Sequence, residues 1–361
     1  AADAPSPPAE SPPENGMNGR VNSALLNLRA APSTGAGLLA RLPQNTELNI
    51  IGRSTDSAWY FVRLVTGGDG WVFARYVSTA LDIAALPVAE AIPNPAIAAS
   101  ADNLPPAPTF FTLGATAWQA FANGQELGNR RDVFSKVGDS ITFSELMYRP
   151  LGFGVYDLGG FGYLQGTLDF FSRTIARDNN SFANSSLAAF NGWTTDHVLN
   201  SANADPQFCQ PGESPLACEY RNTRPAVALI MLGTNDVVQL SPEHYAANLR
   251  TILQITMDSG VIPVLSTIPP RRDSESKTAL FNALIVQVAA EMGASLWDYG
   301  AVMQALPDYG LSADGVHPSA PPGGFGYAAN FSEDGLKYGY VLRNLTALQV
   351  LDTLRQQVLG R

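Results

Sequence analysis

Three short blocks of this sequence carry side chains that together could cleave an ester. The blocks read "VGDSIT" around Ser140, "MLGTND" around Asn235, and "DGVHPS", which holds Asp314 and His317. Serine hydrolysis needs a hydroxyl, a base that takes its proton, and an acid that orients the base. Taken alone, Ser140 is either a nucleophile or only a polar residue of a Gly-Asp-Ser turn.

The base has few candidates, because the chain contains three histidines. His197 in "TTDHVL" and His244 in "SPEHYA" have the pattern of helical surface positions. His317 lies in a loop, three residues after Asp314 and directly before Pro318. That spacing lets a carboxylate reach the imidazole around a tight turn, so we favour His317 as the base.

The reaction also develops negative charge on a carbonyl oxygen, and hydrogen-bond donors must be waiting for it. The backbone N–H of Ser140 is one candidate, and the side-chain amide of Asn235 is a second. Gly192 in "FNGWTT" is a third, because a backbone without a Cβ can approach a substrate closely.

Each block follows an expected β-strand. The stretch 133–138 leads to Ser140, the apolar run 225–233 leads to Asn235, and the short strand 294–300 precedes the block with His317. Expected helices alternate with these strands, at 115–128, 241–260, 276–293 and 334–359. Such alternation predicts a parallel sheet with helices on both faces, and the three blocks then meet at its carboxyl edge.

The order and spacing of the blocks "VGDSIT", "NGWTT", "MLGTND" and "DGVHPS" resemble the SGNH (GDSL-type) hydrolase family over about residues 130–361. The resemblance implies Ser140 as nucleophile, His317 as base and Asp314 as its orienting acid. It also implies an oxyanion hole built from Ser140, Gly192 and Asn235. The implied fold is α/β, a flavodoxin-like three-layer α/β/α sandwich, and no metal or organic cofactor is implied.

The sequence departs from the family in its spacing. Fifty-two positions separate Ser140 from Gly192, and the long segment 143–191 is rich in glycine and aromatic residues. This segment, or the irregular stretch after His317, is expected to wall or cover the cleft. Trp193 either lines the acyl pocket or only packs. The substrate stays open among lipid esters, acetylated sugars and thioesters.

The N-terminal part has a different character. Residues 1–16 read as a disordered Pro-rich tail, and residues 17–80 alternate short β-type runs with turns. The pieces "LNLRAAPS", "AWYFVRL" and "GWVFARYV" resemble the bacterial SH3-like domain, a small all-β barrel. The resemblance implies a binding module often found on cell-wall proteins, and the alternative is a mere spacer. A Pro/Ala-rich linker, residues 81–107, leads to the hydrolase domain, residues 108–361.

The composition of the chain disfavours some classes of partner and indicates the cell compartment. The formal net charge of -10 disfavours nucleic acid, and no apolar run is long enough to span a bilayer. Cys209 and Cys218 lie in a short loop that a disulfide closes easily. We favour a disulfide over two free thiols, and a disulfide indicates an exported protein. The start "AADAPSPPAESPPENG" fits a mature terminus after signal removal or the boundary of an expressed segment.

Other classes fit less well. An α/β-hydrolase lipase would carry G-x-S-x-G, which does not occur, and a dinuclear metallophosphoesterase would need more histidines. A non-catalytic wall-binding protein is opposed by the intact blocks. We therefore expect an exported serine esterase without cofactor, acting on O-acetyl or short acyl esters of a carbohydrate. The alternative is a lipase-like acylhydrolase, and the SH3-like domain is expected to take a cell-wall ligand.

Overall fold

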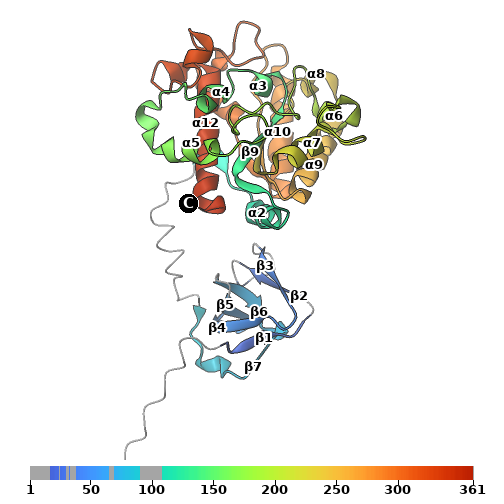
Figure 1. Cartoon of the computed structure of the whole chain (residues 1–361), viewed down its shortest axis with the longest axis vertical. Coiled ribbons are helices and arrows are strands. Elements are labelled where there is room, and N and C mark those ends of the chain that lie inside the picture. The colour runs from blue at the N-terminus through green and yellow to red at the C-terminus, as the bar shows by residue number, and fades with distance from the viewer. Residues whose placement is uncertain are drawn as a thin grey trace, which may run out of the picture. The chain divides into compact units, whose positions relative to one another are not determined.

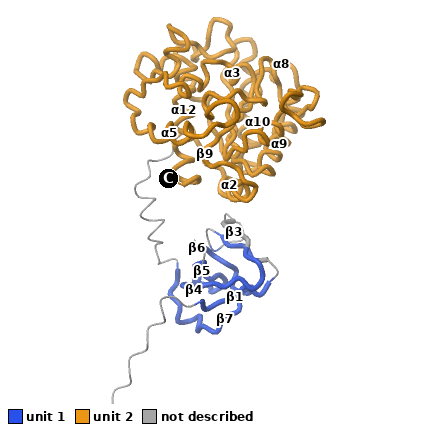
Figure 2. The backbone as a smooth tube through the Cα atoms, in the orientation of Figure 1, with its two compact units in different colours: residues 1–104 blue, residues 105–361 orange. Residues whose placement is uncertain are grey.

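The computed structural model describes residues 17–23, 25–29, 32, 38–64, 69–89 and 108–360. The chain forms two compact units, residues 1–104 and 105–361 (Figure 2). The predicted tail, residues 1–16, lies outside the described residues, as does most of the predicted linker, residues 90–107.

The first unit is an antiparallel sheet of seven strands in the order β3-β2-β6-β5-β4-β1-β7. Alternate residues of β4 and β5 point into a core of Leu, Ile and Val, as the period of two requires. This confirms the all-β, SH3-like N-terminal unit. The strands are β1 (Gly19–Val21), β2 (Leu25–Arg29), β3 (Leu38–Pro43), β4 (Glu47–Arg53), β5 (Trp59–Leu64), β6 (Asp69–Phe73) and β7 (Val77–Thr79).

The start of the predicted linker packs against this unit. The N–H of Arg53 donates to the carbonyl of Pro87 (3.0 Å), and Ala89 is buried against Trp59 and Trp71. The folded unit therefore continues past residue 80, the predicted boundary, to Ala89.

The second unit is built on a five-stranded sheet in the order β8-β12-β11-β10-β9. Four strands run parallel, and the short β8 joins the edge antiparallel to β12. Every residue of β10 is buried, as the continuous apolar run predicted. The strands are β8 (Phe111–Thr112), β9 (Arg130–Gly138), β10 (Pro225–Met231), β11 (Ile262–Ser266) and β12 (Ser295–Trp297).

Helices cover both faces of this sheet, which confirms the three-layer α/β/α sandwich (Figure 1). One face carries α2 (Ala117–Glu126), α5 (Gln165–Ser172) and α12 (Gly339–Leu354). The other carries α6 (Thr195–Leu199), α7 (Pro215–Thr223), α9 (Pro242–Asp258) and α10 (Glu275–Met292). Shorter helices lie in the connections: α3 (Ser140–Phe143), α4 (Arg149–Gly152), α8 (Asp236–Gln239) and α11 (Tyr299–Met303).

The ends of two helices follow their sequence signals. Ser241 caps α9 by accepting a hydrogen bond from the N–H of His244, and Gly293 ends α10 with a φ of 67°. The closing helix, expected from residue 334, instead begins at Gly339. Residues Gly335–Lys337 form a separate short turn, and Tyr338 after it has an extended backbone (φ -106°, ψ 136°), so α12 starts only beyond Tyr338.

Within the described ranges, no helix combines the length and the apolar character needed to cross a membrane.

Candidate active site

Ser140 lies where β9 ends and α3 begins. The carboxylate of the fully buried Asp139 caps this helix by accepting a hydrogen bond from the N–H of Ile141 (2.9 Å). Gly138 is required just before it, because a Cβ there would lie 2.2 Å from Thr142 Oγ1. The turn therefore projects the Ser140 side chain from the carboxyl edge of the sheet.

A line of hydrogen bonds runs from this serine to an acid. Ser140 Oγ lies 2.8 Å from His317 Nε2, and His317 Nδ1 lies 2.8 Å from Asp314 Oδ2. In this arrangement the hydroxyl can donate to Nε2 while Nδ1–H donates to the carboxylate. The structure thus brings together all three residues of the predicted triad, whose roles in catalysis stay predictions.

The acid is held by its own turn. Asp314 Oδ1 accepts from the Ser312 hydroxyl (2.7 Å) and from the N–H groups of Val316 (2.8 Å) and His317 (3.0 Å). Partial burial raises the pKa of Asp314, but these hydrogen bonds and the imidazole outweigh burial and hold that pKa well below its usual range. The carboxylate is therefore ionised at any pH at which the protein would work.

The three predicted oxyanion donors come from separate segments. The N–H of Ser140 is in the first turn of α3 and has no acceptor within the helix. Gly192 has a φ of 76° and no atom near the position of a Cβ, so its backbone is open on that side. The amide of Asn235 donates to the carbonyl of Trp193 (2.9 Å), which fixes the end of β10 against the loop that contains Gly192.

Two aspartates near the site make hydrogen bonds that hold the local backbone. Asp139 caps α3, and burial raises its pKa to about 6. Asp236 Oδ1 accepts from the N–H (2.8 Å) and the hydroxyl (2.6 Å) of Thr195 at the start of α6. The Asp139 bond fixes the backbone at Ser140, and the Asp236 bonds join the chain next to Asn235 to Thr195, three residues after Gly192.

The other two histidines lie on helices. His197 completes a capping box with Thr194 at the start of α6. His244, in the first turn of α9, lies 2.7 Å from Asp196 Oδ1. Neither contacts Ser140, so the structure is consistent with structural positions for both.

Residues of the long segment 143–191 form one wall of a groove of about 620 Å³. Two of its lining residues are bonded to segments of the site: the N–H of Phe190 donates to the carbonyl of Gly138 (3.3 Å), and the carbonyl of Trp193 accepts from Asn235. Phe143 and Phe190 line its near end with Trp193, which also packs partly buried against the core. Sequence reasoning missed Ser312 and the polar residues of the groove. The spacing Ser-x-Asp could have indicated the Ser312–Asp314 bond, whereas nothing in the sequence pointed to the groove.

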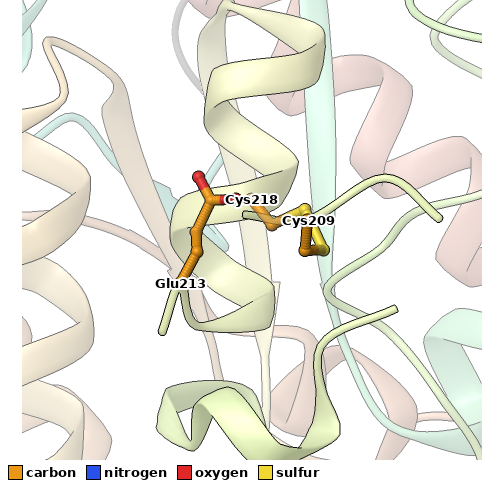
Figure 3. Close-up of side chains that lie close together, drawn as sticks. All are labelled: Cys209, Glu213 and Cys218. Atoms are coloured by element: carbon orange, nitrogen blue, oxygen red, sulfur yellow. A yellow bond between two sulfur atoms is a disulfide. The ribbon is translucent and has the colours of Figure 1, made fainter. Parts of the chain in front are cut away.

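A disulfide joins Cys209 and Cys218, as predicted (Figure 3). Among the described residues, these cysteines and Glu213 are the group closest to a metal-ligand arrangement. The two sulfur atoms are bonded to each other, and Glu213 accepts hydrogen bonds from Arg221 at 2.8 Å. The cluster therefore links the loop before α7 to that helix.

Comparison with known proteins adds two domain assignments. The sequence model of the GDSL-like lipase/acylhydrolase family matches residues 137–321, which is more than half of the chain. That of the bacterial SH3 domain matches residues 23–78. A search of curated proteins finds no match.

Solved structures with a similar backbone include several esterases. An acetyl esterase mutant with an acetate ion is 16% identical, with a TM-score of 0.40, over 62% of this chain and 99% of that chain. The esterase EstA from Pseudoalteromonas sp. is 15% identical, with a TM-score of 0.39, over 62% and 97%. A carbohydrate esterase family 3 protein from Talaromyces cellulolyticus is 16% identical, with a TM-score of 0.40, over 62% and 99%.

Proposed function

Because the chain belongs to the GDSL-like lipase/acylhydrolase family and is a hydrolase that acts on esters, we propose that it is a serine esterase. It cleaves O-acetyl or other short acyl esters of carbohydrate through an acyl-enzyme intermediate. The observation that supports this most is the continuous hydrogen-bonded line from Ser140 through His317 to Asp314.

Acylation begins at Ser140. His317 Nε2 takes the hydroxyl proton while Ser140 Oγ forms a bond to the ester carbonyl carbon. Asp314 holds the imidazole by its Nδ1–H and stabilises the positive charge that develops on the ring. His317 then gives the proton to the departing alcohol oxygen as the carbon–oxygen bond of the ester breaks.

Deacylation repeats these steps with water. His317 removes a proton from the water as its oxygen bonds to the acyl carbon, and the proton passes to Ser140 Oγ as the acyl group leaves as a carboxylic acid. In both steps the carbonyl oxygen carries negative charge, and the N–H groups of Ser140 and Gly192 and the amide of Asn235 stabilise it.

The surroundings of Ser140 support a small acyl group and a bulky alcohol. Phe143 and Phe190, beside the serine, are 42% and 50% exposed, so they form an open surface rather than an enclosed apolar tunnel. Long acyl chains bind best where most of their surface is buried. The bacterial SH3 domain also favours an ester on a cell-wall polymer over a lipid ester as the substrate.

A substrate panel tests this function. p-Nitrophenyl esters of increasing acyl length and O-acetylated oligosaccharides are compared by kcat/KM on the full chain. The expected result is efficient cleavage of acetates, with a kcat/KM that falls as the acyl chain becomes longer. Preference for long acyl chains would instead favour the lipase-like alternative, and no cleavage of any ester would refute the proposed function.

The SH3-like unit is proposed to hold the enzyme on polymeric substrate, and residues 108–361 are proposed to contain the whole catalytic site. A protein consisting of residues 108–361 should cleave p-nitrophenyl acetate as the full chain does, and should lose activity on insoluble acetylated wall material. A soluble but inactive shortened protein would show that the SH3-like unit contributes to the site.

Export is proposed from the disulfide and the bacterial SH3 domain together. Mass spectrometry of the protein isolated from its native source, without reduction, should detect the Cys209–Cys218 link. Two alkylatable thiols in that protein would refute the disulfide in the native protein and remove one of the two grounds for export.

A further inference from the structure

The groove beside the site has an aromatic entrance. Phe143 lies three residues after Ser140 in α3, and Phe190 and Trp193 flank Gly192. The ring centroids of Phe143 and Phe190 are 5.1 Å apart, and those of Phe190 and Trp193 are 6.0 Å apart. The N–H of Phe190 donates to the carbonyl of Gly138 (3.3 Å), so the strip of three aromatic rings adjoins the turn that carries Ser140.

The lining of the groove also has a polar and charged part. Arg177 and Asp178 from the long segment after α5 belong to it, as do Asn203 and Asp205 from the chain after α6. Phe208 lies in the same part, because the guanidinium group of Arg177 lies over its ring. A groove of about 620 Å³ is far larger than an acetyl group requires, so most of it is available to the alcohol part of an ester.

The positive charge in this part of the lining, on Arg177, is balanced by groups of the protein itself. Arg177 Nη2 donates to the carbonyl of Ser185 (2.6 Å) and lies 3.4 Å from Asp178 Oδ2. Its guanidinium group also lies over the ring of Phe208, 4.4 Å from the centroid. Arg177 therefore has its partners within the protein, and Asp178 offsets its charge.

Asp205 leaves a surplus negative charge. Its Oδ1 accepts a hydrogen bond from the N–H of Gln207 (2.9 Å), and no cation of the described residues forms an ion pair with it. The charged side chains that line the groove, Arg177, Asp178 and Asp205, thus sum to a net charge of minus one. An anionic ligand would meet repulsion there, whereas hydroxyl groups could donate to the carboxylate.

The wall that holds Asp205 is fixed in place. The carbonyl of Asp205 accepts from the N–H of Cys209 (2.8 Å), which is disulfide-bonded to Cys218 in α7. The carbonyl of the neighbouring Phe208 accepts from Arg221 Nη2 (2.7 Å). A ligand would therefore find this carboxylate already positioned, which reduces the entropy cost of binding.

These features together match a sugar better than a lipid. An acyl chain laid along the groove would desolvate the charged groups of its lining without replacing their hydrogen bonds. A sugar ring instead has an apolar face that packs on an aromatic ring and hydroxyl groups that pair with carboxylates and amides.

Resting on the proposed esterase function, we propose that this groove binds the alcohol part of the ester as a neutral glycan. One ring lies on the strip formed by Phe143, Phe190 and Trp193, and a following unit donates hydroxyl hydrogen bonds to Asp205. Asp205 thereby selects against uronic acids and phosphate-bearing polymers. The net charge of -10 of the whole chain acts in the same direction.

The experiment compares three substrates on the full chain at low ionic strength: p-nitrophenyl acetate, O-acetylated xylo-oligosaccharides, and O-acetylated galacturonate oligomers of equal length. We expect kcat/KM on the neutral oligomer to exceed that on the uronate by about tenfold or more. Asp205→Lys should abolish most of this preference. The matched control is Asp258→Lys, the same change of charge on the exposed end of α9, and it should leave the preference as in wild type.

The outcomes separate this proposal from the proposed function. No hydrolysis of p-nitrophenyl acetate or of either acetylated oligomer by wild type would refute the esterase itself. Hydrolysis of that ester, with equal rates on neutral and uronate oligomers, would overturn only the neutral-glycan proposal, as would an unchanged preference in Asp205→Lys. If Asp205→Lys does not fold, Asp205→Asn keeps the size of the side chain and removes its charge, and the uronate should then gain relative to the neutral oligomer.

Discussion

Ser140 and His317 are hydrogen-bonded to each other but are held by opposite means. Ser140 follows the buried strand β9, and the carboxylate of Asp139 that caps its helix is fully buried. His317 and Asp314 lie in a loop, and their side chains are 39% and 50% exposed. Their positions depend on local bonds from Ser312, Val316 and His317 itself.

This difference predicts which measurement each half of the site should affect. Packing holds the nucleophile, so changes next to Ser140 should alter the stability of the fold. Hydrogen bonds within one exposed turn hold the base, so removal of the His317 side chain should alter activity and leave stability nearly as it was.

The largest effect is expected on the loop side. His317→Ala removes the base, and kcat for p-nitrophenyl acetate should fall by about 10⁴-fold or more. The thermal midpoint should change little, because the side chain is partly exposed and makes no core contact. His244→Ala is the matched control, and its activity should stay near wild type. Loss of stability that parallels the loss of activity would contradict the proposed difference between the two halves.

The next effect concerns the strand side. Asn235→Ala keeps the backbone after β10 and removes the amide, and kcat should fall by about 10²–10³-fold with little change in KM. The bond to the carbonyl of Trp193 is also lost, so the free energy of unfolding should fall by about 1 kcal/mol. A rise in KM at constant kcat would show that Asn235 binds the substrate rather than the oxyanion.

Stability on the strand side should also depend on pH through Asp139. Its pKa in the folded protein, about 6, lies above its ordinary value of 3.8 because it is buried. Asp139 therefore stabilises the fold fully below about pH 4, and this contribution, about 3 kcal/mol, is lost as the pH rises through 6. Asp139→Asn should remove this decrease from the pH dependence of the unfolding free energy.

Asp314 shifts in the opposite direction, and its contribution separates the two halves further. Its pKa is lowered, so it stabilises the fold above the ordinary carboxylate pKa and loses that contribution only as the pH falls through its lower folded value. Wild type and Asp139→Asn share this contribution of Asp314. The difference between their unfolding free energies therefore isolates the contribution of Asp139. Parallel curves for wild type and Asp139→Asn between pH 4 and 7 would contradict the account of the strand side.

The smallest effect on catalysis should come from a region that belongs to neither half. Replacing Cys209 and Cys218 with serine opens a short loop and should lower the free energy of unfolding by about 2–3 kcal/mol. Hydrolysis of p-nitrophenyl acetate should stay nearly unchanged, because neither cysteine contacts Ser140 or His317. A large fall in kcat on this small ester would show that the disulfide supports the catalytic residues directly.

The residues at the strand ends could be predicted from sequence because a strand leaves a clear pattern. Apolar runs such as 225–231 locate the sheet, and a parallel sheet brings the residues after each strand to one edge. The turn around Asp314 could also be predicted from sequence, because its hydrogen bonds reach only a few residues along the chain.

The groove could not be predicted, because long-range contacts place the segments that line it. The buried Lys136 of β9 donates to the carbonyls of Phe182 (2.9 Å) and Asn184 (2.6 Å). Arg130, also in β9, donates to the carbonyls of Ile175 and Ala176. These bonds fix irregular backbone that has no periodicity, so no local pattern indicates where Arg177 or Asp205 will lie.

Covalent labelling decides whether Ser140 is the nucleophile. Wild type treated with a serine-reactive phosphonate and analysed by peptide mass spectrometry should carry one adduct, on Ser140. Ser140→Ala should carry none and should lose ester hydrolysis with its thermal midpoint unchanged, while Ser144→Ala, the same change one turn further along, should be labelled and active. Full activity in Ser140→Ala, or an adduct on a different serine, would contradict the account.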